Sequence, residues 1–260
     1  MKLAIVTGAA QGLGLCTGAI LARDGFRLLL LDRQPPEAAL ARLRAAGATA
    51  QALVGDVACE AFAEEVAAWV AANAGAADVL VNNAGISLIR PAEQTTAAEW
   101  RRVLDVNLLG PFLLSKALGL QMLERRRGSI VNVASIAGLA GIGHRSAYNA
   151  SKHGLIGLTR TLAAEWGARG VRVNAVCPGW IKTEMDAKDQ GSGAYSDADI
   201  THRVPMARFA RPEDVAEAIA FLADEERSAF VNGVSLPVDG GWIADASWDG
   251  LRLKTRDSGA

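Results

Sequence analysis

Seven short apolar segments alternate with longer helical patterns along most of the chain. Each segment is rich in aliphatic residues, and a glycine or a polar side chain follows it within two residues. Continuous apolar segments separated by helices are typical of parallel strands that are buried on both faces. The predicted strands are Lys2–Val6, Leu28–Leu31, Ala48–Val54, Asp78–Val81, Ser129–Val133, Val171–Cys177 and Val234–Val238.

The alternation predicts an α/β fold: a single-domain, Rossmann-like, doubly wound parallel sheet of about seven strands with helices on both faces. No linker separates two halves, so one domain is expected over residues 1–242, with a tail at 243–260. Residues 180–210 mix charges, glycines and serines, which indicates a substrate lid. The expected helices run from Gly14 to Asp24, Pro35 to Ala46, Cys59 to Asn73, Thr96 to Arg127 with an interruption near Gly110-Pro111, Tyr148 to Trp166, and Arg211 to Ala223.

The composition excludes several function classes. Half of the 260 residues are apolar and the net charge is −1, which argues against disorder and against nucleic-acid binding through bulk charge. Three cysteines without paired spacing and three histidines indicate neither a disulfide framework nor a metal site. Strand-like residues begin at Lys2, which leaves no room for a signal peptide, and no apolar run approaches a membrane span. We therefore expect a soluble cytoplasmic protein with a small-molecule substrate and no nucleic-acid, membrane or metal partner.

A glycine-rich turn follows the first strand. Gly8, Gly12 and Gly14 have the spacing G-x3-G-x-G and precede a helical pattern. A strand, a glycine turn and a helix together place backbone N–H groups against a pyrophosphate. A plain tight turn is the alternative, but the position after the first strand favours dinucleotide binding. Gln11 and Leu13 lie in the same turn and join the predicted cofactor contacts.

Asp32 ends the second strand, 18 residues after Gly14. This is close to the spacing of about 20 at which an acid meets the adenosine ribose hydroxyls. A carboxylate accepts from a free 2′-hydroxyl and repels a 2′-phosphate, so we predict NAD as the cofactor. The neighbouring Arg33 could instead pair with a 2′-phosphate. A surface turn residue is the structural alternative for Asp32.

Three residues around the fifth strand suggest proton transfer. Ser135 follows that strand, and Tyr148 and Lys152 share a helix face at i and i+4. A nearby ammonium favours the phenolate and lowers the pKa of a tyrosine, and a serine hydroxyl can orient a substrate oxygen. The trio could move a proton on or off an alcohol oxygen. Taken alone, Tyr-x3-Lys is also a common solvated helix face.

Other polar residues follow strands or lie within helices. Gly55-Asp56-Val57 ends the third strand, and Asn82-Asn83-Ala84-Gly85 follows the fourth. The small and amide residues of the second group suit close approach of a ligand or a tight turn. Asn107 lies in an otherwise apolar helical pattern, where a hydrogen-bonded core amide is the usual interpretation.

The ordered set of motifs resembles the short-chain dehydrogenase/reductase family. It comprises Thr7-Gly8-x3-Gly12-x-Gly14, Asp56, Asn82-Asn83-Ala84-Gly85, Asn107, Ser135, Tyr148-x3-Lys152 and Pro178-Gly179, and it covers about residues 2–242. Each motif is weak or moderate, but the set in this order is highly specific. Departures are Asn232-Gly233, where Thr or Ser is more usual before the glycine, Pro237, which suggests an edge strand, and a tail of some eighteen residues after Trp242.

The resemblance implies a role for each matched residue. Tyr148 would be the acid/base, Ser135 would bind the substrate oxygen, and Lys152 would lower the tyrosine pKa and hold the nicotinamide ribose. Asn107 would position a water that links Lys152 to solvent. The remaining cofactor contacts would be Asp56 and Val57 at the adenine, Asn83, Ala84 and Gly85 along the adenosine, and Pro178, Gly179, Ile181 and Thr183 at the carboxamide. A homotetramer or dimer would be formed through helices near Gly110–Arg125 and Ser151–Trp166.

The predicted function is hydride transfer between a secondary alcohol and NAD. Alternatives are an NADPH-dependent ketoreductase and, in another class, a non-catalytic dinucleotide-binding redox sensor, which would not need Ser135, Tyr148, Lys152 and Asn107. Two His-Arg pairs hint at a polar or anionic substrate, such as a sugar, polyol or hydroxy acid. The candidate substrate contacts are Ser87, Ile136, His144, Arg145, Trp180, Met185, His202 and Arg203. Trp242, Trp248 and Leu251 could pack the tail on a neighbouring subunit or over the site.

Overall fold

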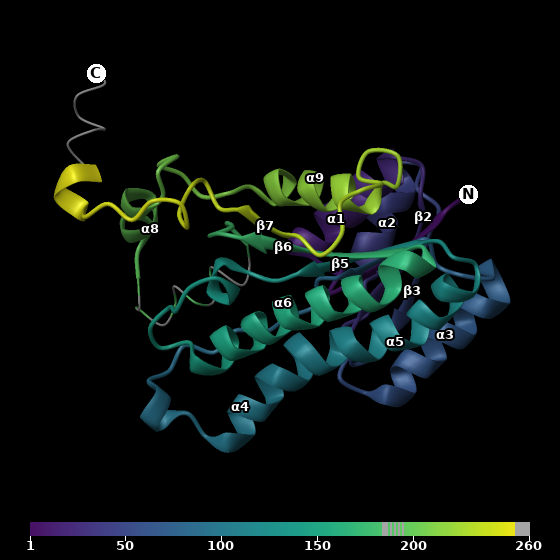
Figure 1. The fold of residues 1–260 in the computed structure, drawn as a ribbon, viewed down its shortest axis with the longest axis horizontal. Helices are drawn as coiled ribbons and strands as arrows, with labels where there is room; N and C mark the ends of the chain where they lie inside the picture. Colours follow the sequence, from purple (N-terminus) through teal and green to yellow (C-terminus); the bar gives the residue numbers. More distant parts are fainter. Residues whose placement is uncertain (184–186, 188, 190, 192, 194, 253–260) are drawn as a thin grey trace.

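The protein was analysed as a computed structural model, which describes residues 1–183, 187, 189, 191, 193 and 195–252. Within the described residues, seven parallel strands form one sheet in the order β3-β2-β1-β4-β5-β6-β7 (Figure 1). The predicted fold class is therefore confirmed. The strands are β1 Leu3–Thr7, β2 Arg27–Asp32, β3 Ala50–Val54, β4 Val79–Asn82, β5 Gly128–Val133, β6 Val171–Pro178 and β7 Ser235–Val238.

Helices cover both faces of the sheet. Figure 1 shows α1, α2 and α9 on one face and α3, α5 and α6 on the other. The helices are α1 Gly12–Arg23, α2 Glu37–Ala45, α3 Glu60–Ala74, α4 Ala97–Leu104, α5 Gly110–Glu124, α6 Ser146–Trp166, α8 Asp197–Arg203 and α9 Pro212–Ala223. Short helical turns are η1 Ala92–Gln94, η2 Asp105–Leu109, η3 Ile136–Gly138 and η4 Gly167–Arg169.

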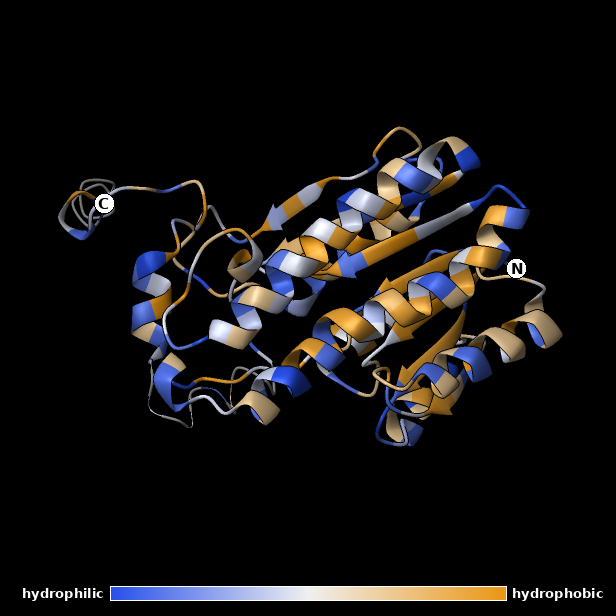
Figure 2. Ribbon diagram, turned by 60° about the horizontal axis from the view of Figure 1, so that its bottom comes forward, coloured by the Kyte–Doolittle hydropathy of each residue, from blue (hydrophilic) through white to orange (hydrophobic). Residues whose placement is uncertain are grey.

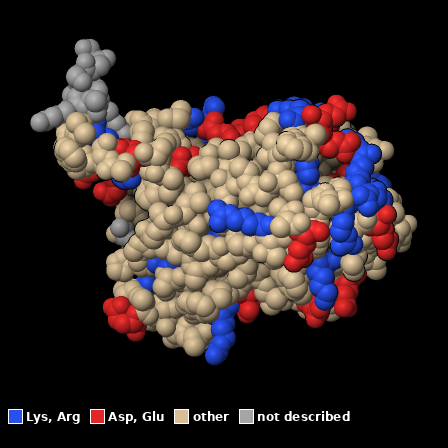
Figure 3. Space-filling model, in the orientation of Figure 1, with Lys and Arg blue, Asp and Glu red and all other residues tan. Residues whose placement is uncertain are grey.

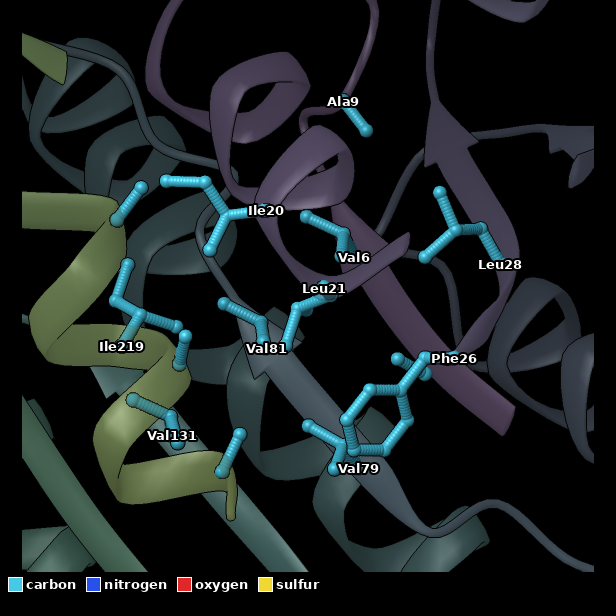
Figure 4. Close-up of a cluster of buried hydrophobic side chains, with 14 of the residues drawn as sticks. Val6, Ala9, Ile20, Leu21, Phe26, Leu28, Val79, Val81, Val131 and Ile219 are labelled. Carbon is cyan, nitrogen blue, oxygen red and sulfur yellow. The ribbon is translucent and has the colours of Figure 1, made fainter. Parts of the chain in front are cut away.

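Alternate residues of each central strand enter two different cores. In β1, Val6 packs with Ile20 and Leu21 of α1 and Ile219 of α9 (Figure 4). Its neighbour Ile5 packs on the opposite face, in the cluster that contains residues of α3 and α5. Figure 2 shows the hydrophobic residues concentrated on the strands and along the helices that cover them. Two apolar layers therefore hold the sheet between the helices, which explains why the strand sequences are continuously apolar.

The direction of winding reverses between β1 and β4. These neighbours pair with Ala4 opposite Val79 and Val6 opposite Val81, while the chain continues to β2 on one side and β5 on the other. In open α/β sheets, ligands bind outside the carboxyl ends of the strands at this reversal. The glycine turn after β1 and the Asn82–Gly85 segment after β4 lie at that point.

The helical segment before β5 changes next to the interruption predicted near Gly110-Pro111. Helix α4 ends at Leu104, η2 forms one π-helical turn over Asp105–Leu109, and α5 begins at Gly110, so the chain stays helical throughout. Ala97–Glu124 is thereby one helix with an 18-residue window of mean hydropathy 1.4, enough in length and composition to cross a membrane. The helix is not an uninterrupted apolar run, because Asp105, Asn107 and Lys116 lie within it, so the expectation about apolar runs is not contradicted. Since 56% of that window is buried inside the protein, the segment matches a core helix.

The lid region contains a helix that the sequence did not predict. Helix α8 begins after Ser196, whose hydroxyl accepts from the N–H of Asp199, while the Asp199 carboxylate accepts from the N–H of Ser196. This reciprocal pair is a capping box with Asp in the position that Glu or Gln usually takes. The signal was present in the sequence as Ser-x-x-Asp.

Two departures from the family pattern are accommodated in the structure. Among the described residues, strand β7 lies at the sheet edge and pairs with β6 alone, so the edge position expected from Pro237 is confirmed. The side chain of Asn232 accepts from the N–H of Val173 and donates to the carbonyl of Ala163, each over 2.9 Å. Asn232 therefore links α6 to β6.

The tail folds back against α8 within the described residues. The Arg203 guanidinium lies 4.6 Å from the centroid of the Trp242 ring and donates to the carbonyls of Trp242 and Asp245. Trp248 and Leu251 are exposed, so neither packs on the site in this chain. The last eight residues of the tail lie outside the described residues.

Candidate active site

A cavity of about 660 Å³ lies at the carboxyl ends of the strands. It contains every residue predicted to bind the cofactor, from Gly8 at the glycine turn to Thr183 after β6. Its lining also includes Ser135, Tyr148 and Lys152 at one end. The sheet topology thus brings together residues that are distant in the sequence.

The glycine turn is packed directly against the segment after β4. A Cβ at Gly14 would lie 2.1 Å from the carbonyl oxygen of Gly8, and Gly8 itself has a φ of +63°. The Thr7 hydroxyl accepts from the N–H groups of Asn83 and Ala84 over 2.9 and 2.8 Å. A Cβ at Gly8 would lie 2.9 Å from the Cα of Ala84, so only glycine fits where the turn contacts the segment after β4.

The start of α1 suits an anionic ligand. No side chain caps this helix, and Gln11, Gly12, Leu13 and Gly14 all line the cavity. The first N–H groups of a helix have no partner within the helix, and the helix dipole favours negative charge there. A glycine-rich turn beside these N–H groups fits the diphosphate of a dinucleotide.

Asp32 is held in place by the backbone around it. Its two carboxylate oxygens accept from the N–H of Ala10 over 2.9 Å and from the N–H of Gln34 over 3.0 Å. Asp32, Arg33 and Gln34 line the cavity beyond the glycine turn. The carboxylate is fixed against the turn, whereas Arg33 is exposed.

Asp56 and Arg102 form an ion pair that the sequence did not predict. The Arg102 guanidinium donates to Asp56 over 2.6 Å, and the N–H of Ala58 donates to the other oxygen over 3.0 Å. Burial would raise the pKa of Asp56, but these two donors outweigh it and hold the pKa below its usual value. Both residues line the cavity, so Arg102 joins the predicted contact Asp56.

Ser135, Tyr148 and Lys152 come together as the sequence predicts. The Ser135 side chain is hydrogen-bonded to the Tyr148 hydroxyl, and the Lys152 ammonium lies 5.6 Å from the centroid of the Tyr148 ring. The ammonium donates to the carbonyl of Val133, at the end of β5, over 2.7 Å. Helix α6 thus presents Tyr148 and Lys152 on one face, toward the end of β5 and the Ser135 that follows it.

The pKa of Tyr148 is not lowered as the sequence predicted. Burial raises its pKa, and this outweighs the lowering by the Ser135 hydrogen bond and by the charge of Arg145. Burial also lowers the pKa of Lys152 to about 8. The ammonium faces the ring and the Val133 carbonyl, so in this structure its charge does not dominate the environment of the phenol.

Asn107 lies beside the cavity but does not line it. Its amide donates to the carbonyl of Ile86 and to the Ser151 hydroxyl, and its oxygen accepts from the N–H of Ile86. A Cβ at Gly85 would lie 3.3 Å from the Asn107 oxygen and 3.7 Å from the Lys152 nitrogen. In the described residues the side chain is a fully buried connection between η2, α6 and the segment after β4. The water-positioning role stays a prediction.

The substrate end of the cavity contains some of the predicted residues. Ser87, Ile136, Arg145 and Trp180 line it. Ile142, Asp189 and Tyr195 also line it and were not predicted. The Trp180 and Tyr195 rings lie 4.9 Å apart between centroids, and Arg145 forms an ion pair with Asp189. These neighbours are far apart in sequence and carry no motif that indicates their contact.

Three candidate substrate residues are not brought to the cavity, and a fourth is not described. His144 and His202 are exposed and do not line it. The Arg203 guanidinium lies over the Trp242 ring and forms an ion pair with Asp245. Met185 lies outside the described residues. The two His-Arg pairs therefore do not act together, since only Arg145 faces the cavity.

Comparison with known proteins gives consistent results. A family model described as enoyl-(acyl carrier protein) reductase matches residues 8–243. D-threitol dehydrogenase of Mycolicibacterium smegmatis is 40% identical over 93% of this chain and 92% of its own. Cis-4-hydroxycyclohexanecarboxylate dehydrogenase of Sinomonas cyclohexanicum is 42% identical over 94% of this chain and 97% of its own. The crystal structure of an actinorhodin polyketide ketoreductase variant with NADPH has a TM-score of 0.90 and 36% identity, covering 94% of this chain and 98% of that one.

Proposed function

Because this chain belongs to the short-chain dehydrogenase/reductase family and is an oxidoreductase of secondary alcohols, we propose that it oxidises a sugar or polyol with NAD as the cofactor. The observation that carries the proposal is the contact between Ser135 and Tyr148 in the cavity, with Lys152 against the same ring. Two hydroxyl groups beside a buried ammonium would contribute little to stability at the edge of a dinucleotide-binding cavity. This arrangement fits a site where an alcohol proton is transferred.

The cofactor would be held along the whole cavity. The N–H groups at the start of α1 would hold the diphosphate, Asp32 the adenosine ribose, and Asp56 with Val57 the adenine. Lys152 would hold the nicotinamide ribose, and Ile181 with Thr183 the carboxamide. When bound, the nicotinamide supplies the hydride acceptor in oxidation and the hydride donor in reduction.

The protein residues supply orientation and proton transfer. The substrate hydroxyl would bind between Ser135 and Tyr148. Ser135 would donate to the substrate oxygen and fix its position, while the Tyr148 oxygen would take the hydroxyl proton in oxidation and return it in reduction. Lys152, held by the Val133 carbonyl, would supply positive charge 5.6 Å from the centroid of the phenol ring. The product of oxidation would be a ketone, or a lactone from a cyclic hemiacetal.

The preference for NAD rests on Asp32. Its carboxylate is fixed by two backbone N–H groups at the place where the ribose 2′-hydroxyl would lie. A 2′-phosphate there would meet a negative charge that cannot move away. An NADPH-dependent ketoreductase is the second candidate, supported by the exposed Arg33 beside Asp32 in the cavity lining. The ratio of kcat/KM for NAD and NADP tests this choice.

The substrate class is proposed from the site and the relatives. A cavity lined by Ser87, Arg145, Asp189 and Trp180 is polar enough for a sugar or polyol. The named substrates of the two relatives include an alditol and a carboxylate, so similarity alone does not choose between neutral and anionic alcohols. A spectrophotometric screen of NADH formation over alditols, sugars, hydroxy acids and sterol-like alcohols tests the function. The absence of NADH formation with every alcohol, together with tight NADH binding, would instead support the redox sensor.

A homotetramer is proposed as the assembly. Leu109, Phe112 and Leu120 are exposed apolar residues at helical spacing along η2 and α5. Figure 3 shows that the central part of the face bearing α5 and α6 has few charged residues. An uncharged helical face of this kind is typical of a subunit interface. Light scattering after gel filtration tests it, and substitution of Leu120 by Arg should reduce the measured mass.

The proposed location is the cytoplasm. Cys16, Cys59 and Cys177 are all free thiols, and free thiols persist in reducing compartments. Fractionation of the producing cell, with detection of the enzyme by antibody, tests this location.

A further inference from the structure

Arg145 is a buried guanidinium at the substrate end of the cavity. It immediately precedes α6 and is 7% exposed. Its guanidinium carbon lies 6.0 Å from the centroid of the Tyr148 ring and 5.5 Å from that of Trp180. An arginine in this position could bind an anionic group on a substrate whose alcohol is held at Tyr148.

The protein already supplies an anion to this arginine. One guanidinium nitrogen donates to the Asp189 carboxylate over 2.9 Å and to the Ser87 hydroxyl over 2.6 Å. The side chains of Arg145 and Asp189 are only 8% and 13% exposed. A buried guanidinium is unfavourable without a counter-charge, and Asp189 provides it. The ion pair therefore makes this part of the cavity close to neutral.

We infer that Asp189 occupies the anion position beside Arg145 and so makes the enzyme select uncharged polyhydroxy alcohols over their carboxylate analogues. This inference rests on the proposed secondary-alcohol dehydrogenase function. A substrate carboxylate that approaches Arg145 meets the charge of Asp189 in a site with little water, and the repulsion opposes its binding. A substrate hydroxyl meets no such penalty, because it can donate to the carboxylate and accept from the guanidinium.

Trp180 adds a donor that suits the same substrates. Its indole N–H is buried and has no hydrogen-bond partner among the described residues, although the side chain lines the cavity. A buried donor without a partner is costly, and an acceptor oxygen on a substrate removes that cost. A hydroxyl-rich molecule supplies such oxygens and a sterol-like alcohol does not. Asp189 therefore disfavours anions, and Trp180 disfavours apolar alcohols.

The test compares short alditols with the aldonates of the same skeletons, using NAD at saturation. We expect the wild-type kcat/KM to favour the alditol by about tenfold or more. In Asp189→Asn the aldonate/alditol ratio should rise by about tenfold or more, because Arg145 is then free to bind the carboxylate. The double variant Arg145→Gln/Asp189→Asn should lose that rise, since the cation is absent. Asp189→Glu should keep the wild-type preference.

Two outcomes would overturn the inference while leaving the proposed function in place: equal wild-type use of both substrate types, or an Asp189→Asn ratio within about twofold of wild type. No NADH formation from any alcohol by the wild-type enzyme would overturn the proposed function itself. If Asp189→Asn does not fold, calorimetry on the wild-type enzyme with bound NADH still decides. Binding of the aldonate as tight as that of the alditol refutes the inference, and binding about tenfold weaker supports it.

Discussion

The two ends of the cavity are built in different ways. At the glycine turn, the lining consists of short segments that directly follow β1, β2, β3 and β4, and most of their contacts involve the backbone. Asp32 is fixed by two N–H groups, and Thr7 holds the segment after β4. At the other end, Arg145 and Asp189 meet through side chains that are 44 residues apart in the sequence.

The difference shows which properties each end can change independently. Backbone contacts at strand ends depend on the sheet, so the cofactor end tolerates little change without loss of the fold. Side-chain pairs on connecting segments can be exchanged while the sheet stays intact. We therefore expect substitutions at the substrate end to alter specificity, whereas substitutions at the cofactor end should alter cofactor affinity or stability. Tyr148 and Lys152 lie where the two ends meet.

The largest expected effect comes from Tyr148→Phe, at that junction. Loss of the hydroxyl removes the group that exchanges the alcohol proton, so kcat should fall by roughly 10²–10⁴-fold or more. The NADH dissociation constant, measured by fluorescence, should change little, because the substitution keeps the ring and removes only the oxygen that is hydrogen-bonded to Ser135. Stopped-flow measurement of NADH formation checks the rate.

Tyr195→Phe is the matched control, because Tyr148 and Tyr195 are the two tyrosines of the chain and both line the cavity. The control should retain kcat within about tenfold, since Tyr195 packs on Trp180 at the substrate end. Equal losses in the two variants would contradict the acid/base assignment.

Lys152→Met tests how the buried cation at the junction differs from Arg145. In the described residues no carboxylate pairs with Lys152, and burial lowers its pKa from 10.5 to about 8. The unfolded chain therefore binds more protons between these pH values. Below about pH 8 the buried ammonium makes its largest destabilising contribution to the free energy of unfolding. This contribution disappears as the pH approaches 10.5.

The wild-type free energy of unfolding should accordingly rise relative to that of Lys152→Met by roughly 2–3 kcal/mol between about pH 7 and pH 10. Urea unfolding at several pH values measures this difference. The exposed Lys116→Met serves as the control and should show no comparable pH dependence. A constant difference between wild type and Lys152→Met across the range would mean that the lysine is not held in a strongly desolvated state.

The same contrast explains how much of the molecule could be predicted from its sequence. The parallel sheet and the cofactor end were predictable, since Gly8, Asp32 and Asp56 lie at or just after the ends of apolar strands. The Ser135–Tyr148 contact followed from a strand end and one helix face. The Arg145–Asp189 pair could not be predicted, because the sequence shows no clear periodic pattern around Asp189 and Arg145 lies just before the helix that follows it.

The direction of the Tyr148 pKa shift also could not be predicted from the sequence. Spacing indicates that Lys152 lies near Tyr148, but it does not show how deeply the phenol is buried. Nor does it show that the ammonium donates to the Val133 carbonyl. Likewise, the pairing of Arg102 with Asp56 depends on where α4 lies relative to β3. Burial and partner choice arise from the packing of elements, so local patterns do not contain them.

Asp32→Ala tests the cofactor end with a smaller expected effect. Removing the carboxylate eliminates repulsion of a 2′-phosphate and loses an acceptor for the ribose hydroxyl. The ratio of kcat/KM for NADP to that for NAD should rise by about tenfold or more. The KM for the alcohol should stay within about twofold, because Asp32 lies at the opposite end of the cavity. A wild-type preference for NADP, or an unchanged ratio in the variant, would refute the role given to Asp32.

Arg102→Gln should give the smallest change in stability. It also tests whether the two ends of the cavity act independently. The Arg102 and Asp56 side chains are 40% and 33% exposed, so their ion pair should contribute about 0.2–1 kcal/mol at neutral pH. Because the folded state holds the pKa of Asp56 below its usual value, this contribution is present above the pKa of the unfolded chain. It is lost as the pH falls through the lower folded value. The variant should thus be slightly less stable at neutral pH and match the wild type in acid, as urea unfolding would measure.

The kinetics of Arg102→Gln then decide whether the two ends of the cavity are independent. If Asp56 borders the adenine, the KM for NAD should rise a few-fold while the alditol/aldonate preference stays unchanged. The preference should not move, because Arg102 contacts Asp56 after β3, whereas Arg145 and Asp189 contact each other at the substrate end. A change in that preference would show that the two ends are coupled, which contradicts the independence inferred from their construction.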